Sequence, residues 1–328
     1  MYQSLFKKLN LKKIQNLTLL SITYWISCLT QKAYIRLYPA FLSIEPLNFC
    51  NLHCPECPVG NGSLARKKQL LNIKDFQKIV DKLPDTVIWL NLYFQGEPFL
   101  HPQFAEMVKI SNEKGIFTST STNGHFLHNK EEVKNLIFSG LGKLIISIDG
   151  TTQEIYETYR KNGNLQQVID GIKTLVSLKG ELNSKTPFVE IQFLVTKHNE
   201  HQISEIKHLA KSLEVDKLSL KSTQVYDFEQ GNELIPKNKK YSRYTQDKDG
   251  KYRIKKHLKN RCWRQWSGTV ITSAGEVLPC CYDKNAQYSF GNLFENSFKE
   301  IWFGKKANAF CQTILSNRKG IDICNNCQ

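Results

Sequence analysis

The sequence lacks the features that would mark an exported, repetitive or disordered protein. Its 328 residues contain no convincing secretory signal, no internal repeat and no low-complexity tract. Without an export signal we expect a cytoplasmic, reducing location, where clustered thiols are metal ligands more often than disulfides. Apolar residues make up 41% of the chain and charged residues 23%, which is the composition of a soluble protein with a sizeable core.

Acidic residues are absent from residues 1–40, which hold six lysines and arginines. A second basic segment, residues 237–264, carries twelve such residues against only Asp247 and Asp249. Because the net charge of the whole chain is +15, these two segments account for all of the excess and the remainder is close to neutral. The basic character therefore belongs to two appendages on a neutral body.

Short β-rich runs alternate with helical patterns between residue 40 and about residue 230. Segments of helical periodicity, such as Ile73–Leu83 and Leu165–Leu178, separate six strand candidates: Phe41–Pro46, Val87–Gln95, Phe117–Thr122, Lys143–Asp149, Phe188–Thr196 and Lys217–Tyr226. Six β–α alternations predict an α/β fold with a parallel sheet and helices outside it, either doubly wound or closed as a partial barrel.

The strand candidates are apolar on one face and polar on the other; in the second, Leu90 and Leu92 alternate with Asn91 and Tyr93. Burying such polar groups dry would cost about 1–3 kcal/mol each. We therefore expect a partial (β/α)6 TIM-like barrel with a wet, ligand-binding interior; an antiparallel sheet with one solvated face is disfavoured by the alternating helices. The side chains expected to line the substrate space are Asn91, Tyr93, Gln95, Glu190, Gln192 and Lys221.

Ten cysteines fall into two groups, with Cys28 apart. The first group is the run "CNLHCPEC", in which Cys50, Cys54 and Cys57 directly follow the first strand candidate. Three thiolates can hold three irons of a four-iron, four-sulfur cube and leave the fourth iron without a protein ligand. An open coordination position is typical of catalytic metal centres. The alternative is a zinc site completed by His53, whose place beside Cys54 suits a fourth tetrahedral ligand poorly.

The spacing C-x3-C-x2-C after a first strand resembles the radical S-adenosylmethionine (SAM) enzymes, whose fold is a partial (β/α)6 barrel. The resemblance covers roughly residues 40–226. It implies that the open iron chelates SAM, and that an electron from the [4Fe-4S] cube releases a 5′-deoxyadenosyl radical, which takes a hydrogen atom from a substrate. The chain departs from the family at Glu56, where many members have an aromatic residue, and at Gln95, where glycine is commoner.

Companion motifs follow in the family's order at the ends of the next strand candidates. Gly96-Glu97-Pro98 resembles the segment that meets the methionine amino group, and "SIDG" resembles the segment that contacts ribose hydroxyls. Arg160 resembles the basic residue that pairs with the methionine carboxylate. Barrels place their chemistry at the carboxyl ends of strands. The resemblance thus implies eight cofactor-binding residues: Gly96, Glu97, Pro98, Ser121, Asn123, Ser147, Asp149 and Arg160.

The second cysteine group lies in residues 262–328. The spacing from Cys262 through Gly275 to Cys280 resembles the start of the SPASM and twitch iron–sulfur extensions, in which a hairpin brings two cysteines together. The shorter twitch arrangement implies one fully ligated auxiliary [4Fe-4S] cluster. A structural zinc suits four thiolates equally well and stays an alternative. The expected ligands are Cys262, Cys280, Cys324 and Cys327. Cys281 and Cys311 are left over, and Cys281 is an alternative ligand to Cys280.

We expect four segments: a basic and apolar helical extension (1–39), the barrel (40–230), a basic hairpin linker (231–261) and a β-hairpin-plus-helix iron–sulfur domain (262–328). Residues 14–31 are uncharged and marginal for spanning a membrane, so they predict a helix that closes the bottom or flank of the barrel. The alternative is an interfacial membrane contact supported by nearby lysines, namely Lys7, Lys8, Lys12 and Lys13.

The basic linker predicts a solvated hairpin that turns at Asp249-Gly250. Its interleaved tyrosines are also typical of nucleic-acid binders, but a lysine-rich surface hairpin is the favoured interpretation and nucleic acid is not expected as a partner.

Together the motifs predict a radical SAM oxidoreductase that abstracts hydrogen from a polar substrate and oxidises it with the help of the auxiliary cluster. Its expected partners are an electron donor such as flavodoxin or ferredoxin, and a polar small-molecule or peptide substrate. One alternative is a SPASM-type peptide-modifying enzyme with a separate leader-binding partner, because residues 1–39 are too few for a leader-recognition domain. The other is a zinc-bearing nucleic-acid-binding protein that uses the basic hairpin.

Overall fold

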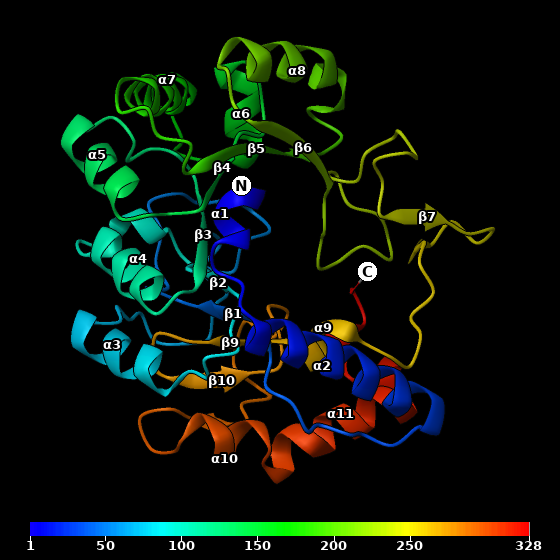
Figure 1. Cartoon of the computed structure of the whole chain (residues 1–328). Helices are drawn as coiled ribbons and strands as arrows, with labels where there is room; N and C mark the ends of the chain where they lie inside the picture. The colour runs from blue at the N-terminus through cyan, green and yellow to red at the C-terminus, as the bar shows by residue number, and fades with distance from the viewer. Residues whose placement is uncertain (328) are drawn as a thin grey trace.

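A computed structural model of the chain describes residues 1–327, so only Gln328 of the predicted C-terminal domain lies outside the described residues (Figure 1). The fold is built on one nine-stranded sheet with the order β11-β10-β9-β1-β2-β3-β4-β5-β6. Its first six strands pair in parallel and in chain order. They are β1 (Phe41–Ile44), β2 (Trp89–Asn91), β3 (Phe117–Thr122), β4 (Lys143–Ser147), β5 (Phe188–Val195) and β6 (Lys217–Ser222).

Helices follow the first five of these strands and cover the outer face of the curved sheet (Figure 1). They are α3 (Ile73–Lys82), α4 (Phe104–Glu113), α5 (Lys130–Phe138), α6 (Gln153–Tyr159), α7 (Leu165–Glu181) and α8 (Ile203–Ser212), with the short 3-10 turns η1 (Pro98–Leu100) and η2 (Glu200–Gln202). Side-chain caps fix several starts; Asn72, Asn129 and Asn164 accept backbone N–H bonds in the first turn of α3, α5 and α7. The predicted α/β class with a partial parallel barrel is confirmed.

The alternation of the strands separates the core from the barrel interior. The outward residues are fully buried beneath the helices, as Leu90, Leu144 and Ile191 illustrate with 0% exposure. Their neighbours, such as Asn91 and Gln192, point inward and stay half-exposed. A single apolar layer therefore holds the helices, while the interior keeps the polar character that the sequence predicted.

The C-terminal hairpin joins the same sheet at the free edge of β1. Strand β9 (Gly268–Ile271) pairs in parallel with β1, and β10 (Glu276–Leu278) and β11 (Gly291–Asn292) follow in antiparallel order. Gly275 forms the predicted turn with φ +81, where an added Cβ would meet Asn292 Oδ1 at 2.7 Å. The sequence predicted the hairpin but not its pairing with β1.

The remaining C-terminal helices pack beside this hairpin. They are α9 (Trp263–Ser267), α10 (Phe298–Trp302) and α11 (Lys305–Asn317), followed by the 3-10 turns η3 (Arg318–Gly320) and η4 (Asp322–Cys324). The basic linker contains the predicted hairpin as β7 (Tyr244–Gln246) and β8 (Tyr252–Ile254). Its turn is longer than the two-residue turn expected, because Asp247 Oδ1 accepts hydrogen bonds from the N–H groups of Asp249 and Lys251.

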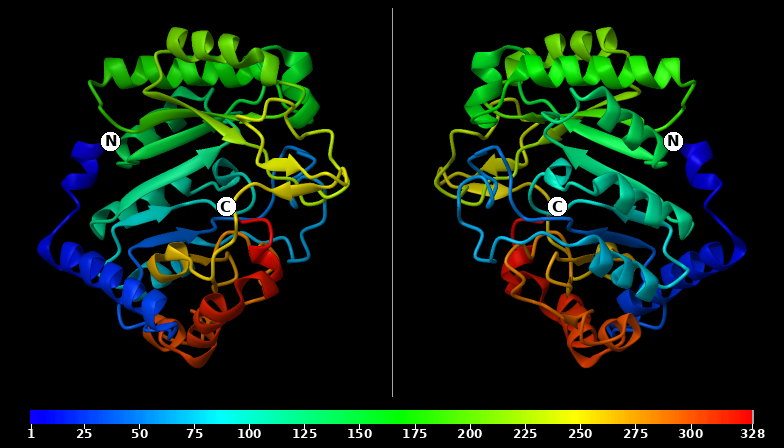
Figure 2. Two further views of the ribbon diagram at one scale, coloured as in Figure 1. Left: turned by 90° about the vertical axis from the view of Figure 1, so that its right-hand side faces the viewer. Right: turned by 90° about the vertical axis from the view of Figure 1, so that its left-hand side faces the viewer.

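Two helices precede the barrel, α1 (Tyr2–Phe6) and α2 (Leu11–Thr30). They run along the end of the sheet at which the parallel strands begin, away from the β7–β8 hairpin (Figure 2). The Lys13 ammonium on α2 donates to the carbonyl of Gly115, just before β3. Among the described residues, none of the helices combines the length and the hydropathy needed to cross a bilayer.

Candidate functional site

The loop that carries the first three cysteines leaves the carboxyl end of β1. Cys54 is buried, whereas Cys50 and Cys57 are half-buried, and the N–H of Cys57 donates to the carbonyl of Cys54 at 3.1 Å. Two glycines allow the loop to pack closely. A Cβ at Gly60 would lie 2.5 Å from the Cys54 nitrogen, and one at Gly96 would lie 2.7 Å from the Phe49 oxygen. The backbone therefore fixes where the three sulfurs point.

Burial favours the neutral form of two of these thiols. Burial raises the pKa of the Cys50 thiol to about 11 and also raises the pKa of Cys54. Bound metal requires thiolates, so a cluster held here would displace the thiol protons of Cys50 and Cys54. The donor set of three thiols is therefore chemically suited to an iron–sulfur cube.

A single zinc ion fits the loop less well. Within residues 1–327 no three histidine, cysteine or acidic side chains lie close enough together to hold one metal ion. The alternative fourth ligand, His53, is exposed, and its Nδ1 lies 3.2 Å from the carbonyl oxygen of Gly60. In a cube each thiolate binds a different iron, so its ligands lie further apart than those of one zinc ion.

Glu97 ties together the loops after β2 and β3. Its carboxylate is fully buried and accepts hydrogen bonds from Thr122 Oγ1 at 2.7 Å, from the N–H of Asn123 at 2.7 Å and from the N–H of Phe99 at 3.1 Å. Burial raises its pKa, although these three bonds act in the opposite direction. Glu97 thus positions the neighbouring Gly96 turn and the Asn123 amide.

The Asn123 side chain reaches the cysteine loop. Its Nδ2 donates to Asn51 Oδ1 at 2.8 Å and lies 3.8 Å from Cys50 Sγ. Its Oδ1 accepts the N–H of His125 and lies 3.0 Å from the His125 Nδ1. His125 Nε2 in turn accepts the N–H of Asn164, so Nδ1 carries the proton and fixes the orientation of the amide.

Asp149 and Arg160 form a buried ion pair next to the second sulfur. Arg160 Nε lies 2.5 Å from Asp149 Oδ2, and Nη1 lies 3.8 Å from Cys54 Sγ. The other carboxylate oxygen of Asp149 accepts the N–H of Leu194. Burial lowers the pKa of Arg160, but the charges of Asp149 and Cys54 outweigh it and raise that pKa well above its ordinary value. The site therefore contains one permanent cation.

The two serines predicted for the cofactor lie on the neighbouring strands. Ser147 is buried at the end of β4 and is in register with Gln192 of β5, while Ser121 on β3 is half-buried and is in register with Ile145 of β4. Of the other predicted cofactor residues, Gly96, Asn123 and Asp149 follow β2, β3 and β4, whereas Pro98 begins η1 and Arg160 lies at the end of α6.

The predicted substrate-lining residues do not all lie together. Asn91 Oδ1 accepts hydrogen bonds from Trp89 and Ser119, and Gln95 is buried with its Oε1 unpartnered. Lys221 is exposed on β6.

Glu190 lies near the opposite ends of the strands, where its carboxylate is 2.8 Å from Lys143 Nζ and 3.5 Å from Lys217 Nζ. Glu190 on β5 therefore forms ion pairs with a lysine of β4 and a lysine of β6, and these pairs connect the three strands. A contact between Glu190 and the substrate stays a prediction.

A cavity of about 400 Å³ lies between the barrel and the C-terminal hairpin. Tyr93 and Asn91 line it from β2 and its following loop, and Arg264, Cys280 and Cys281 line it from the other side. Arg264 Nη1 donates to Cys281 Sγ at 3.1 Å. Ligand pockets typically measure about 300–1,000 Å³, so this space is large enough for a small molecule or one side chain.

The second group of cysteines converges on another cavity, of about 690 Å³. Arg318 Nη2 lies 3.3 Å from Cys327 Sγ there, and burial raises the pKa of the Cys280 and Cys324 thiols. Cys281 is not among its lining residues, and Cys311 is buried in the core on α11. The four cysteines that line the cavity are the four predicted ligands: Cys262, Cys280, Cys324 and Cys327.

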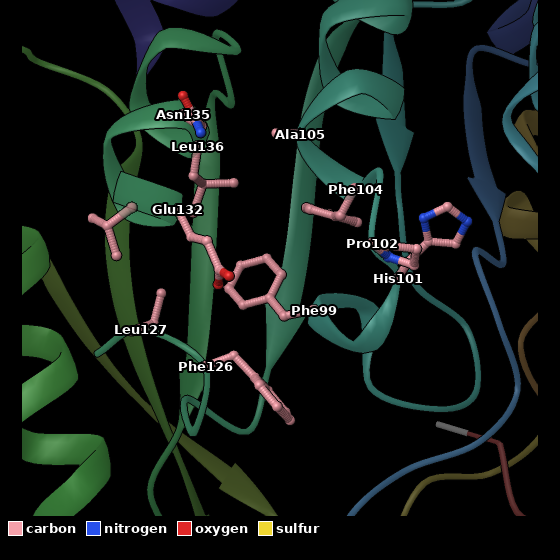
Figure 3. Close-up of a pocket in the computed structure, with 11 residues that line it drawn as sticks. Phe99, His101, Pro102, Phe104, Ala105, Phe126, Leu127, Glu132, Asn135 and Leu136 are labelled. Atoms are coloured by element: carbon pink, nitrogen blue, oxygen red, sulfur yellow. The ribbon is translucent and has the colours of Figure 1, made fainter. Parts of the chain in front are cut away.

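A third cavity, of about 180 Å³, lies outside the strands between η1, α4 and α5 (Figure 3). Phe99, Phe104 and Phe126 line it together with Glu132. The sulfur ligands do not contribute to it, so we do not assign the chemistry to this space.

Two further interactions were not predicted from the sequence. Glu56 in the cysteine loop accepts the N–H of Tyr226 at 3.0 Å and so holds the chain after β6. Glu45 at the end of β1 binds Arg66 through two hydrogen bonds of 2.6 and 2.7 Å, and also accepts from Ser273 in the C-terminal hairpin. The only sequence signal for these interactions was an acidic residue in an unusual place: Glu45 after an apolar run and Glu56 within the cysteine-rich run.

Two protein-family models match the chain. The Radical SAM superfamily model matches residues 44–210, and the SPASM model, described as an iron–sulfur cluster-binding domain, matches residues 262–328.

Curated relatives are distant. The antilisterial bacteriocin subtilosin biosynthesis protein AlbA of Bacillus subtilis is 24% identical over 280 residues, which are 80% of this chain and 59% of AlbA. The tungsten-containing aldehyde ferredoxin oxidoreductase cofactor-modifying protein of Pyrococcus furiosus is 26% identical over 304 residues, 82% of each chain. The chain therefore spans less than two thirds of AlbA but most of the second relative.

Among solved structures, Streptococcus suis SuiB bound to the precursor peptide SuiA has a TM-score of 0.62 with 18% identity. The similarity covers 84% of this chain and 67% of SuiB. At this level of identity the comparison establishes the shared fold.

Proposed function

Because the chain belongs to the radical SAM superfamily and carries a SPASM domain, we propose that it removes a hydrogen atom from a polar substrate held between its two cysteine sites. The radical SAM domain binds SAM and a [4Fe-4S] cluster, and the SPASM domain carries auxiliary iron–sulfur chemistry. When bound, these groups supply a 5′-deoxyadenosyl radical and an electron acceptor for the substrate. The reducing electron comes from a donor such as flavodoxin or ferredoxin.

In this proposal Cys50, Cys54 and Cys57 hold the SAM-binding cluster. Arg160 pairs with the SAM carboxylate, since it is a buried cation 3.8 Å from Cys54 Sγ. Glu97 and Asn123 keep the two strand-end loops in place, and they do so through bonds that the fold already contains. The tight Gly96 turn, which leaves no room for a side chain, brings its backbone close to the cofactor.

The proposed position of the substrate rests on one observation. The cavity of about 400 Å³ shares Cys280, Trp263 and Arg264 with the cavity of the second cysteine group, and reaches Tyr93 on the barrel side. A substrate there would lie next to the auxiliary site, which favours a net oxidation with one electron leaving through that site. Tyr93 and Arg264 would bind its polar or anionic groups.

The chemistry is tested by anaerobic reconstitution with iron and sulfide, addition of dithionite and SAM, and mass spectrometry. We expect 5′-deoxyadenosine from the unchanged chain and none from Cys54→Ala. We also expect about eight irons per chain, of which about four remain in Cys324→Ser. Zinc instead of iron, or 5′-deoxyadenosine production by Cys54→Ala, would contradict the proposal.

A peptide substrate is a second candidate, because AlbA serves bacteriocin biosynthesis and SuiB binds a precursor peptide. Here the substrate group in the cavity would be one side chain of a longer chain bound across the barrel mouth. Pull-down with candidate precursor peptides separates the two substrates. Retention of a peptide that then loses two hydrogens or gains a cross-link supports this candidate; turnover of a small molecule alone rejects it.

A further inference from the structure

We infer that helix α2 is a docking surface for an anionic lipid membrane, on which it lies in the plane of the interface. Twelve large apolar side chains of the described residues are exposed, and eight of them lie between Phe6 and Leu29. We call the outward side of α2 its outer face; exposures there run from 42% at Ile26 to 82% at Leu29, and its members are Leu11, Ile14, Ile22, Trp25, Ile26 and Leu29.

The side of α2 that packs on the protein is unusually polar. Lys13, Asn16 and Ser27 are buried there with exposures of 3%, 6% and 0%. Each is satisfied: Lys13 Nζ donates to the carbonyls of Gly115 and Lys8, Asn16 Nδ2 to the carbonyl of Tyr38, and Ser27 Oγ to that of Thr23. The bonds of Lys13 to Gly115 and of Asn16 to Tyr38 attach the helix to other segments, beside buried Leu20 and Tyr24. The helix turns an apolar stripe outward, unlike an ordinary surface helix.

This attachment fixes which side faces out. Tyr24 also packs edge-to-face against Trp263 and Trp266, at centroid distances of 5.2 and 5.5 Å. Rotating the helix to bury the outer face would break these contacts and leave the Lys13 ammonium buried without partners or drive it into solvent. The exposed stripe is thus a stable property of the fold, and such a contiguous apolar surface marks an interaction site.

The charge around the stripe selects the partner. Residues 1–40 contain six basic residues and no acidic ones; Lys7, Lys32 and Arg36 are exposed, and Lys12 pairs with Asp85 at 3.1 Å. Arg261 of the basic linker lies 5.6 Å from the Trp25 ring. A second copy of the chain would bring like charge against like charge, whereas anionic headgroups complement the basic border and the interior of the lipid accepts the apolar side chains. Trp25 is also a residue type favoured at such interfaces.

The test is co-sedimentation of the full, cluster-loaded chain with vesicles, carried out anaerobically. We expect binding to phosphatidylcholine vesicles that contain phosphatidylglycerol, and about tenfold weaker binding to phosphatidylcholine alone. The double variant Ile22→Glu with Leu29→Glu should lose binding. The matched control Phe138→Glu, which changes a 70% exposed ring on α5, should bind like the unchanged chain. Lys32→Glu with Arg36→Glu should weaken binding and its dependence on salt.

Should the double variant fail to fold, quenching of Trp25 by brominated lipid in the unchanged chain, with Trp25→Phe as reference, gives the same answer. Absence of sedimentation with anionic vesicles overturns the inference. So does a dimer in light scattering that the double variant abolishes without any lipid binding, since the outer face would then cover a second copy. Binding that survives in the double variant overturns it as well, because another surface would be responsible.

Discussion

His101 and His125 are both buried in a single neutral tautomer. His101 Nε2 lies 2.8 Å from the carbonyl oxygen of Leu71, and its Nδ1 accepts the N–H of Gln103. His125 has the opposite arrangement, with Nε2 accepting from Asn164. Protonation of either ring would place a proton against an existing N–H donor. Burial lowers the pKa of both below the ordinary value of 6.5.

Stability should therefore fall on acidification. Because the folded-state pKa is depressed, the unfolded chain takes up protons first as the pH drops below 6.5. The free energy of unfolding then decreases with falling pH, and its slope corresponds to the uptake of at most one proton per histidine. Urea unfolding at a series of pH values measures this slope. The variants His101→Gln and His125→Gln should be less stable at neutral pH but less sensitive between about pH 7 and pH 5.5. An unchanged slope in both variants would show that other groups are responsible.

Cys280 and Cys281 are adjacent and both line the cavity of about 400 Å³, but only Cys280 also lines the cavity of the four cysteines. Cys280 lines the cavity of the four cysteines, whereas Cys281 is exposed and accepts from Arg264. Cys280→Ser should reduce the iron content from about eight to about four per chain, because a four-iron cube would lose one of its ligands. Cys281→Ser should keep about eight. Iron analysis after anaerobic reconstitution distinguishes the two variants. Iron loss in Cys281→Ser, and not in Cys280→Ser, would mean that Cys281 is the ligand.

Prediction from sequence succeeded where a feature depends on local spacing, as the turn at Gly275 does. The spacing also predicts Cys50, Cys54 and Cys57 as cluster ligands, and that assignment stays a prediction. Prediction from sequence did not find His125 or Glu56, because their partners Asn164 and Tyr226 are distant in the chain and only the fold brings them together. For Glu190 the polar position on the strand was recognised, but its neutralisation by lysines of two other strands was not.

At the scale of elements, a buried ion pair connects the barrel to the C-terminal hairpin. The side chains of Glu45 and Arg66 are 0% and 9% exposed, and Ser273 donates to Glu45 through both its N–H and its hydroxyl. Arg66 Nε also donates to the carbonyl of Lys284. The end of β1 is therefore held on three sides by groups from separate segments.

Breaking this pair should be costly. Arg66→Ala leaves the Glu45 carboxylate buried without its cation, which typically destabilises a protein by about 3–5 kcal/mol. Glu45→Gln with Arg66→Met removes both charges and should recover a large part of that loss. Urea unfolding of the single and double variants gives the coupling energy. As a control, removal of the exposed Lys12–Asp85 pair should cost less than about 1 kcal/mol.

The strands and helices of the barrel were predictable because each carries its own periodic pattern. The predicted range Phe117–Thr122 equals β3, and Ile73–Leu83 exceeds α3 by one residue. The second strand was predicted to reach Gln95 but ends at Asn91, because the chain turns toward Gly96, whose φ is +79. Pairing of β9 with β1 was not predictable, since it depends on which edge of the sheet remains open.

On the scale of the whole molecule, barrel and C-terminal domain share one sheet. Removing residues 262–328 would expose the backbone of β1 along the edge that β9 now covers, and an open edge next to an apolar core promotes aggregation. The shortened chain should therefore elute as aggregates in size-exclusion chromatography. Cys262→Ser with Cys324→Ser, which keeps the sheet but lacks two auxiliary ligands, should elute as the unchanged chain does. Aggregation of both variants would mean that the cluster, not the strand, maintains solubility.

The overall charge distribution was predictable from composition, but its placement was not. The two basic segments are far apart in the chain, yet Arg261 of the linker lies over Trp25 of α2. The polar packing face of α2 was also hidden, because Lys13 and Asn16 become buried only when Gly115 and Tyr38 supply their acceptors.

The pairing of Phe41 with Gly268 has a consequence for biosynthesis. During translation β1 leaves the ribosome early, while its second partner strand emerges only with the last quarter of the chain. The nascent barrel must wait with one flank unfinished, and the residues of β1 that precede the first cysteine loop reach their final surroundings late. The strand that precedes the N-terminal cysteine loop is thus fully paired only after β9 has been made.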